Sequence, residues 1–304
     1  MRRGLTYGAA AYLIWGLFPL YFPLLAPAGS LEILAHRMIW SLVVAAVVLT
    51  VVRGWPEIRS TPPRVWAQVL AGAVLIAINW GVYIWAVSNG AVVEAALGYF
   101  INPLVSVLMG VIIFKERLRI PQWAAVAVAA CAVGVLAVAG GSVPWIALTL
   151  AASFACYGLV KKVIPLRPTA SLTAEGMILT LPALGYLTFL QWSGGATLTG
   201  HGAAHVLLLA SSGVVTCVPL LAFAVAAQAL PLSVLGLLQY LTPVAQFLLG
   251  VLWFHEAMPT YRWVGFALVW VALVIMTADA LRTAGKQRAA TGAHAPAVRS
   301  ATDA

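Results

Sequence analysis

Hydrophobic residues occur in long uninterrupted runs along most of the chain, and polar residues gather in short segments between those runs. Each run is about 20 residues long, which is the length that a helix rising 1.5 Å per residue needs to cross a hydrocarbon layer about 30 Å thick. The pattern therefore predicts ten membrane-spanning helices. Their approximate positions are Leu5–Leu25, Leu31–Val52, Val65–Val87, Val92–Phe114, Pro121–Ala139, Val143–Val160, Leu172–Trp192, Ala204–Ala227, Leu232–Phe254 and Tyr261–Leu281.

One apolar run has a recognisable second copy. Residues 98–118 read GYFINPLVSVLMGVIIFKERL, and residues 236–258 read GLLQYLTPVAQFLLGVLWFHEAM. At a constant offset of 140 residues, Pro103 aligns with Pro243 without a gap. A repeat of membrane helices at this period indicates a duplicated protein, and an odd number of helices per repeat makes the two copies antiparallel. The expected fold class is an all-α integral membrane protein with ten transmembrane helices, arranged as two inverted five-helix repeats.

The repeat divides the chain into three parts. Residues 1–140 are expected to form the first five-helix repeat, and residues 141–281 the second. Residues 282–304 are rich in Ala, Thr and Gly and poor in large apolar residues, so we expect a disordered cytoplasmic tail there. The first apolar run also resembles a signal peptide, but it exceeds the usual core of about 7 to 15 residues, which favours a retained span.

Composition supports a membrane protein. Hydrophobic residues make up 63% of the chain, charged residues only 8%, and the mean hydropathy is +1.00. The net charge of +9 does not indicate a nucleic-acid partner, because Lys and Arg lie in short clusters between apolar runs rather than among aromatic residues. The three cysteines are isolated within apolar segments without metal-ligand spacing. The sequence therefore predicts no nucleic acid, no cofactor and no metal.

The basic residues predict the orientation. With the N-terminus inside, fifteen of the seventeen Lys and Arg residues fall on the cytoplasmic side of a ten-span topology, and the exceptions are Arg37 and Arg262. After the first copy of the repeat, the turn reads KERLR, whereas the turn after the second copy reads HEAMP. We therefore expect a multi-pass protein of the plasma membrane with both termini in the cytoplasm.

Five segments together resemble the drug/metabolite transporter superfamily, and within it the EamA-type permeases called RarD. They are ILAHRMIWS at 33–41, INWGVYIWAV at 78–87, EAALGYFINPL at 94–104, YGLVKK at 157–162 and VLGLLQYLTPV at 234–244. The resemblance covers nearly the whole chain. It implies two inverted five-helix halves around a central cavity, and export or exchange of small metabolites across the bacterial inner membrane.

Polar residues inside the spans are the best candidates for function, because each is costly in hydrocarbon unless it faces a partner or a cavity. Arg37 has three interpretations: it reaches the headgroups, pairs with Glu32 or Glu94, or lines a cavity. His36 shares a helical stripe with Glu32 and Trp40. A hydrogen-bonded, packed histidine is favoured there over a proton carrier.

Two spans combine polar residues with a proline. Asn102 precedes Pro103, and a polar segment precedes Pro243 in the same way. Each proline removes a backbone donor, so we expect helix-break hinges at both positions, beside a binding site. The candidate substrate-binding residues are Arg37, His36, Trp40, Asn79, Trp80, Tyr83, Tyr99, Asn102, Tyr157, Gln239, Tyr240 and Thr242. The candidate ion or proton partners are Glu32, Glu94 and Glu175, of which Glu175 is also placed to pair with Lys161 or Lys162.

These features favour a secondary transporter over two alternatives. It would move a small metabolite or drug-like molecule, amino-acid-like or anionic, by alternating access. An intramembrane enzyme is the first alternative, but the sequence lacks HExxH, GxSxG and paired intramembrane aspartates, and we expect no enzymatic activity. A channel or receptor is the second. The expected partners are the small-molecule substrate and the lipid bilayer, with a monomer and a homodimer both plausible.

Overall fold

The computed structural model describes residues 2–115, 118–230 and 232–293, and this part of the chain contains helices and connecting turns without any strand. The helices are α1 (Arg2–Gly16), α2 (Phe18–Tyr21), η1 (Phe22–Leu25), α3 (Ser30–Val51), α4 (Trp55–Arg59), α5 (Pro63–Ser88), α6 (Val92–Phe114), α7 (Ile120–Gly140), α8 (Trp145–Val163), α9 (Pro168–Trp192), α10 (Gly202–Ala229), α11 (Leu232–Leu238), α12 (Leu241–Leu248), η2 (Leu249–Trp253) and α13 (Thr260–Ala293).

The apolar runs form helices that are long enough to cross a membrane. Within the described residues, nine segments are long and apolar enough to span, and the bent pair formed by α1 with α2 and η1 is a candidate for a tenth. That pair bends by 45° at Leu17, two residues before Pro19. The coarse prediction of an all-α protein with many membrane-spanning helices is therefore confirmed.

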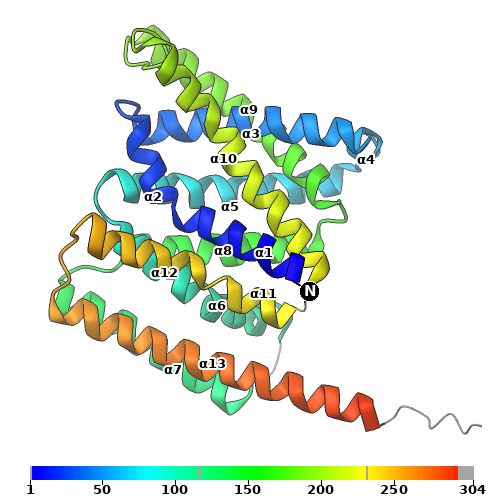
Figure 1. Cartoon of the computed structure of the whole chain (residues 1–304), viewed down its shortest axis with the longest axis vertical. Coiled ribbons are helices and arrows are strands. Elements are labelled where there is room, and N and C mark those ends of the chain that lie inside the picture. The colour runs from blue at the N-terminus through cyan, green and yellow to red at the C-terminus, as the bar shows by residue number, and fades with distance from the viewer. Residues whose placement is uncertain (1, 116–117, 231, 294–304) are drawn as a thin grey trace, which may run out of the picture.

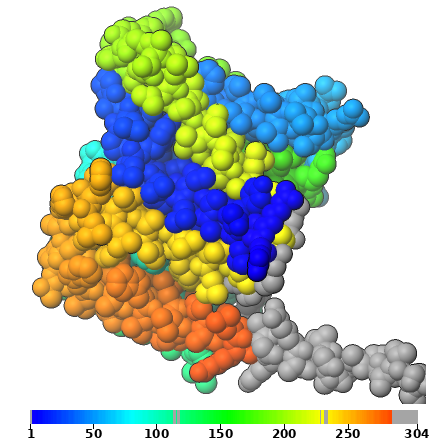
Figure 2. Space-filling model, viewed as in Figure 1, coloured from blue at the N-terminus to red at the C-terminus, as the bar shows by residue number. Residues whose placement is uncertain are grey.

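The long helices pack along one another, with the N-terminus and the end of α13 on the same side of the view (Figure 1). The α1 helix packs on α10 and α12, and Figure 2 shows this N-terminal segment lying across the face between them. The α3 helix packs on α9 and α10, α5 on α8 and α9, α6 on α8 and α12, and α7 on α13. Helices from the two halves of the sequence are thus interleaved in one bundle.

Two turns lie at opposite ends of this bundle. The Glu256 carboxylate accepts hydrogen bonds from the backbone N–H groups of Val92 (2.5 Å) and Val93 (3.0 Å) at the start of α6. A carboxylate there satisfies unpaired helix donors and faces the positive end of the helix dipole. The segment that follows α6 begins at Lys115, at the other end of the same helix. Lys115 and the turn at 254–259 are therefore separated by the length of α6.

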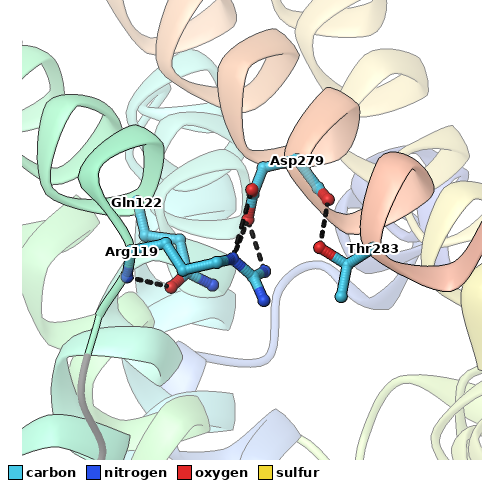
Figure 3. A network of polar contacts seen from close by, with 4 residues as sticks. All are labelled: Arg119, Gln122, Asp279 and Thr283. Atoms are coloured by element: carbon cyan, nitrogen blue, oxygen red, sulfur yellow. Dashed lines mark hydrogen bonds and ion pairs between the residues drawn. The ribbon is translucent and has the colours of Figure 1, made fainter. Parts of the chain in front are cut away.

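Ion pairs tie helices together at the end of the bundle that holds the basic turns. Arg119, just before α7, binds the Asp279 carboxylate of α13 through Nε and Nη2, at 3.0 Å and 2.5 Å from Oδ2 (Figure 3). Glu57 of α4 accepts hydrogen bonds from the backbone N–H and the Nε of Arg167, both at 2.6 Å. Burial raises the pKa of Glu57, but the hydrogen bonds and charge of Arg167 outweigh it and hold the pKa below its ordinary value.

Two sequence expectations need correction: the helix break at Pro103 and the start of the tail. The break expected at Pro103 is absent, because α6 runs continuously from Val92 to Phe114 with the proline inside it. In the second copy, by contrast, α11 ends at Leu238 and α12 begins at Leu241, just before Pro243. A proline removes one donor, and a membrane helix tolerates this when the rest of its ladder is kept. The α13 helix continues past the expected start of the tail to Ala293, and residues 294–304 lie outside the described residues.

A close helix crossing joins α3 to α10. A Cβ atom added at Gly213 of α10 would lie 2.3 Å from the carbonyl oxygen of Trp40 in α3, which is backbone and has no room to move aside. A glycine is therefore required for this approach. The crossing matters because it sets the distance between the polar side chains that α3 and α10 carry.

Gly213→Ala is expected to destabilise the protein, because the added methyl group pushes α3 away from α10. Overpacking of this kind costs about 1 to 3 kcal/mol, which corresponds to a fall in Tm of about 3 to 10 °C. Thermal unfolding of the purified protein in lipid nanodiscs measures the effect. Gly185→Ala in α9 is the matched control, since its Cβ would meet no atom within 4 Å. Equal Tm values for the two variants would contradict the close crossing.

Candidate functional site

Arg37 is buried in the middle of the bundle. Its side chain projects from the third turn of α3, and the residue is only 4% exposed. The Nε atom donates a hydrogen bond of 2.9 Å to the Oγ1 of Thr216 in α10. The Nη1 atom is buried without a hydrogen-bond partner among the described residues. A charged group is thus enclosed with part of its hydrogen-bonding capacity unused.

Aromatic rings surround the guanidinium group. Its central carbon lies 4.0 Å from the ring centroid of Trp80, 5.2 Å from that of Phe18 and 5.8 Å from that of Phe22. These are cation–π distances, and each such contact contributes about 0.5 to 2 kcal/mol. The phenol groups of Tyr83 and Tyr99 are close enough to interact electrostatically with Arg37. The aromatic cage stabilises the charge in part, without neutralising it.

Two short hydrogen-bond networks adjoin the cage. In the first, the Tyr99 hydroxyl donates to Asn79 Oδ1 at 3.2 Å, while Asn79 Nδ2 donates to the Oγ of Ser153 and the carbonyl oxygen of Leu150, both at 3.0 Å. In the second, Gln246 Nε2 donates to the Tyr83 hydroxyl at 2.8 Å. The rings of Tyr83 and Tyr99 meet edge to face, with centroids 5.6 Å apart. The networks therefore connect α5, α6, α8 and α12 around one centre.

Local sequence explains why these side chains meet. Phe18 and Phe22 follow the bend at Leu17, which turns α2 and η1 away from α1 and toward α3 and α5. Trp80 and Tyr83 are three residues apart on α5 and therefore share one face of that helix. Thr216 is three residues after Gly213, so it lies beside the close crossing of α3 and α10. The helix crossing and the helix bend together bring the cage around Arg37.

The acidic partners considered for Arg37 bind elsewhere. Glu32 Oε1 accepts a hydrogen bond of 2.7 Å from the backbone N–H of Thr197, and Glu94 Oε1 accepts one of 3.2 Å from that of Ile146. No ion pair in the described part of the chain includes Arg37. Its burial also argues against a side chain that reaches the headgroups. Of the three interpretations of Arg37, the headgroup and ion-pair interpretations do not fit this geometry, and the cavity-lining interpretation stays a prediction.

Other predicted site residues form a cluster around Glu175 of α9, next to the cage. The Tyr157 hydroxyl donates to Glu175 Oε2 at 3.0 Å, and the Lys161 ammonium binds Glu175 Oε1 at 2.8 Å. The predicted pairing of Glu175 with a neighbouring lysine is therefore confirmed for Lys161. A pocket of about 20 Å³ lies between Glu175 and Trp80, and a space of this size holds about one water molecule.

The remaining predicted residues take part in packing and hydrogen bonds that do not involve Arg37. Asn102 is buried, and its Oδ1 has no hydrogen-bond partner in the described part of the chain. Thr242 Oγ1 donates to the carbonyl oxygen of Tyr12 at 2.7 Å and so joins α12 to α1. Tyr240 packs in the core cluster that contains α13, and Gln239 is half-buried at the break between α11 and α12. Trp40 contributes its backbone to the close crossing rather than its ring to the cage.

His36 and Glu32 belong to a third cluster, at the end of α3 opposite the basic turns. His36 is 3% exposed, and its Nε2 has no hydrogen-bond partner among the described residues. Glu94 is at the same end, where it lines a pocket of about 120 Å³ together with Trp145 and Arg262. The candidate residues thus divide into a central cage, a cluster around Glu175, and a cluster at the end of α3 opposite the basic turns.

Sequence reasoning missed four residues of the centre: Thr216, Gln246, Phe18 and Phe22. Gln246 and Thr216 are polar residues inside predicted spans, so the criterion that selected Asn79 would also have selected them. The two phenylalanines carried no such signal, because an apolar ring in an apolar run is ordinary. Within the described residues, no group of three or more His, Cys, Asp or Glu side chains could hold a metal ion.

Comparisons with known proteins place the chain in a family. The sequence model of the EamA-like transporter family matches residues 2–138. The chain is 55% identical over 300 residues to Protein RarD of Streptomyces exfoliatus, covering 98% of this chain and 95% of that one. It is 44% identical to the uncharacterized transporter YojE of Bacillus subtilis, covering 91% of this chain and 94% of the relative.

A more distant relative and one solved structure extend the comparison. The chain is 31% identical to the chloramphenicol-sensitive protein RarD of Pseudomonas aeruginosa, covering 94% of this chain and 97% of that one. A solved crystal structure covers 92% of this chain and 98% of its own, with a TM-score of 0.58 and 18% identity, which indicates a shared fold alone. Since the relatives match along nearly their whole length, the chain belongs to the EamA-like transporter family of the drug/metabolite transporter superfamily and is a RarD-like, multi-pass membrane permease.

Proposed function

We propose that this protein is a secondary transporter that exports or exchanges a small metabolite or drug-like molecule with an anionic or zwitterionic group. It acts by alternating access in the bacterial inner membrane. The observation that carries the proposal is the buried guanidinium of Arg37, whose Nη1 is unpaired among the described residues and which has no carboxylate partner there. Residues from both halves of the chain contact it, Trp80 from the first and Thr216 from the second. The family name supports transport, and the charge of Arg37 supports the substrate class.

The substrate class follows from the cost of burying Arg37. A guanidinium stays charged at physiological pH, and burial at the centre of a spanning helix costs about 2.5 to 3.5 kcal/mol on insertion scales. Aromatic contacts and one threonine hydroxyl offset this cost only in part. A substrate carboxylate could accept two parallel hydrogen bonds from the guanidinium, which is the geometry that arginine favours. Such a substrate would supply the missing counter-charge.

The helix packing supports the inverted-repeat architecture. Matching each span with the one five places later pairs α1 with α8, α3 with α9, α5 with α10, α6 with α12 and α7 with α13. Under this matching, the α6–α8 contact corresponds to α12–α1, α5–α8 to α10–α1, and α3–α10 to α9–α5. The contacts α3–α9, α6–α12 and α7–α13 correspond to themselves. This is the pattern expected from a pseudo-two-fold axis between two five-helix repeats, residues 1–140 and 141–281.

The proposal as a whole is tested by transport with purified protein. A panel of amino acids, organic acids and drugs is first screened for thermal stabilisation, since a ligand that binds the folded state raises Tm by mass action. Chloramphenicol belongs in this panel because it appears in the name of one relative. Compounds that stabilise the protein are then tested for saturable counterflow in proteoliposomes. Flux that never saturates and shows no counterflow would favour a channel instead.

The orientation is tested by labelling single cysteines at the two repeat-related turns. In a background without the three native cysteines, Ala257→Cys should react with an impermeant maleimide in intact cells. Lys115→Cys should react only after permeabilisation, because the positive-inside rule places its basic turn in the cytoplasm. Both positions are exposed, so labelling after permeabilisation serves as the control. Equal labelling in intact cells would contradict the inverted repeats and the cytoplasmic termini.

The break before Pro243 is expected to be a hinge between the two access states. Pro243→Ala restores a backbone donor that can bond toward Gln239, which should join α11 to α12 and slow counterflow while the protein still inserts. Pro103→Ala is the matched control, because α6 is already continuous and its flux should change less. If both variants transported at the wild-type rate, the prolines would have no part in the conformational change.

Arg37 is expected to select acidic over neutral compounds. Arg37→Lys should weaken counterflow despite the retained charge, because lysine lacks the planar two-pronged donor set. Arg37→Gln should weaken counterflow further, by about tenfold or more. It should reduce thermal stabilisation by acidic compounds more than stabilisation by neutral ones. Arg262→Gln is the control, since that arginine lies in the outer end and binds the carbonyl oxygen of Ala257. Normal flux in well-folded Arg37→Gln would exclude an anchoring role.

A further inference from the structure

A buried cluster of titratable groups lies at the outer end of α3 and α10, apart from the aromatic cage. Glu32 is 2% exposed and His36 is 3% exposed, one helical turn apart on α3. His205 of α10 is 6% exposed, and the charges of both Glu32 and His205 act on the His36 imidazole. An acid and two imidazoles are thus enclosed together, and the mechanism argued above uses none of them.

Thr197 joins two members of this cluster, Glu32 and His205, to the neighbouring His201. Its backbone N–H donates to Glu32 Oε1 at 2.7 Å, and its hydroxyl lies 2.8 Å from His205 Nε2. The carbonyl oxygen of the same residue lies 3.2 Å from Nδ1 of His201. One residue of the α9–α10 connection therefore contacts the acid and two histidines, which holds the cluster in a defined arrangement.

His201 connects the cluster to solvent. It is exposed in the turn before α10, and its ring centroid lies 5.5 Å from that of His205. At the inner end of the series, His36 Nε2 is buried without a hydrogen-bond partner among the described residues. The titratable groups thus run from the exposed His201 through His205 to the buried His36 and Glu32.

The chemistry of this cluster suits a proton rather than a metal ion. No group of three or more metal-ligating side chains is gathered closely enough in the described part of the chain. With both imidazoles neutral, the cluster carries the single negative charge of Glu32. One proton neutralises this charge, and an imidazole is the side chain whose unperturbed titration lies nearest to neutral pH.

We infer that Glu32, His36 and His205 form a buried proton-binding site, filled from the outer side through His201, that makes the proton the coupling ion of the transporter. This inference rests on the proposed transport function. The proton comes from hydronium in the outer solvent. Its transfer forms an N–H bond on an imidazole and releases water. Because His36 precedes Arg37 on α3, a proton on His36 adds positive charge near the proposed substrate anchor and changes substrate affinity.

Other titratable groups on the surrounding helices bear on this site. On α3 itself, Arg37 follows His36. On α10, Cys217 lies near Arg37 and contacts the carbonyl oxygen of Ser41. On α5, Tyr83 belongs to the aromatic cage, and on α9, Glu175 lines the pocket beside Ser41 and is paired with Lys161. None of these groups is among the charges that act on His36, which are those of Glu32 and His205.

The proton site can be tested without any transport substrate. Protein with ¹⁵N-labelled histidine side chains, in nanodiscs, is titrated by NMR from about pH 4.5 to 8.5, a window that brackets the ordinary histidine range. Each of the five histidine signals is assigned by single His→Gln substitution. His36 should titrate within this window. Glu32→Gln, which keeps an acceptor for the Thr197 N–H, should move its midpoint to lower pH by about one unit, because a favourable negative charge is lost.

Controls and the contrary result are defined by the same titration. His205→Gln should also move the His36 midpoint, because the two imidazoles interact. His255 is exposed in the turn between η2 and α13, so His255→Gln should leave the His36 midpoint unchanged. A His36 signal that does not titrate, or that ignores both Glu32→Gln and His205→Gln, would overturn the inference. Wild-type Tm values in the variants exclude misfolding as the cause.

Proton coupling is tested in proteoliposomes that contain the pH indicator pyranine and a compound showing counterflow. Substrate movement by the wild type should change the internal pH. In His205→Gln, substrate should still move, but the proton flux that accompanies it should fall to the leak of protein-free liposomes. An unchanged ratio of proton flux to substrate flux would overturn the coupling role. Wild-type protein without any substrate flux would contradict the proposed transport function instead, and the titration would still decide whether the proton site exists.

Discussion

The uncompensated charge of Arg37 is the constraint on which the centre of this protein depends. A guanidinium remains ionised when buried, so the surrounding residues must supply partners or a substrate must do so. The chain supplies Thr216 and a cage of aromatic rings, including Trp80 at 4.0 Å, and leaves Nη1 unpaired. This incomplete pairing is the observation on which the proposed substrate-binding role of Arg37 rests.

The acidic residues explain why no carboxylate reaches Arg37. The chain has eight Asp and Glu residues, and the six that the structure describes all bind other groups. Four of them accept backbone N–H hydrogen bonds at turns or helix starts, namely Glu32, Glu57, Glu94 and Glu256. Glu175 and Asp279 pair with Lys161 and Arg119. The acids thus hold the ends of the helices together, while the centre keeps a net positive charge.

Close helix packing connects this charge distribution to transport. The α3 and α10 helices approach so closely at Gly213 that their polar faces meet, with Arg37 against Thr216 and the His36 cluster nearer the start of α3. A transporter of this architecture would change access by moving such packed elements as units. A change of charge at either site would therefore act on the same helix pair, which offers a direct physical route between proton and substrate.

The sequence by itself determined the helices, because apolar runs of membrane length depend only on local composition. The one-sided basic residues predict the direction in which these helices cross the membrane. It also indicated Arg37, Asn79, Trp80, Tyr83 and Tyr99, since polar and aromatic residues inside spans stand out. Tertiary structure alone decided which of the candidates meet, that α6 continues through its proline, and that the acids bind backbone donors. Those outcomes depend on helix crossings and on hydrogen bonds between residues far apart in sequence, which periodicity does not encode.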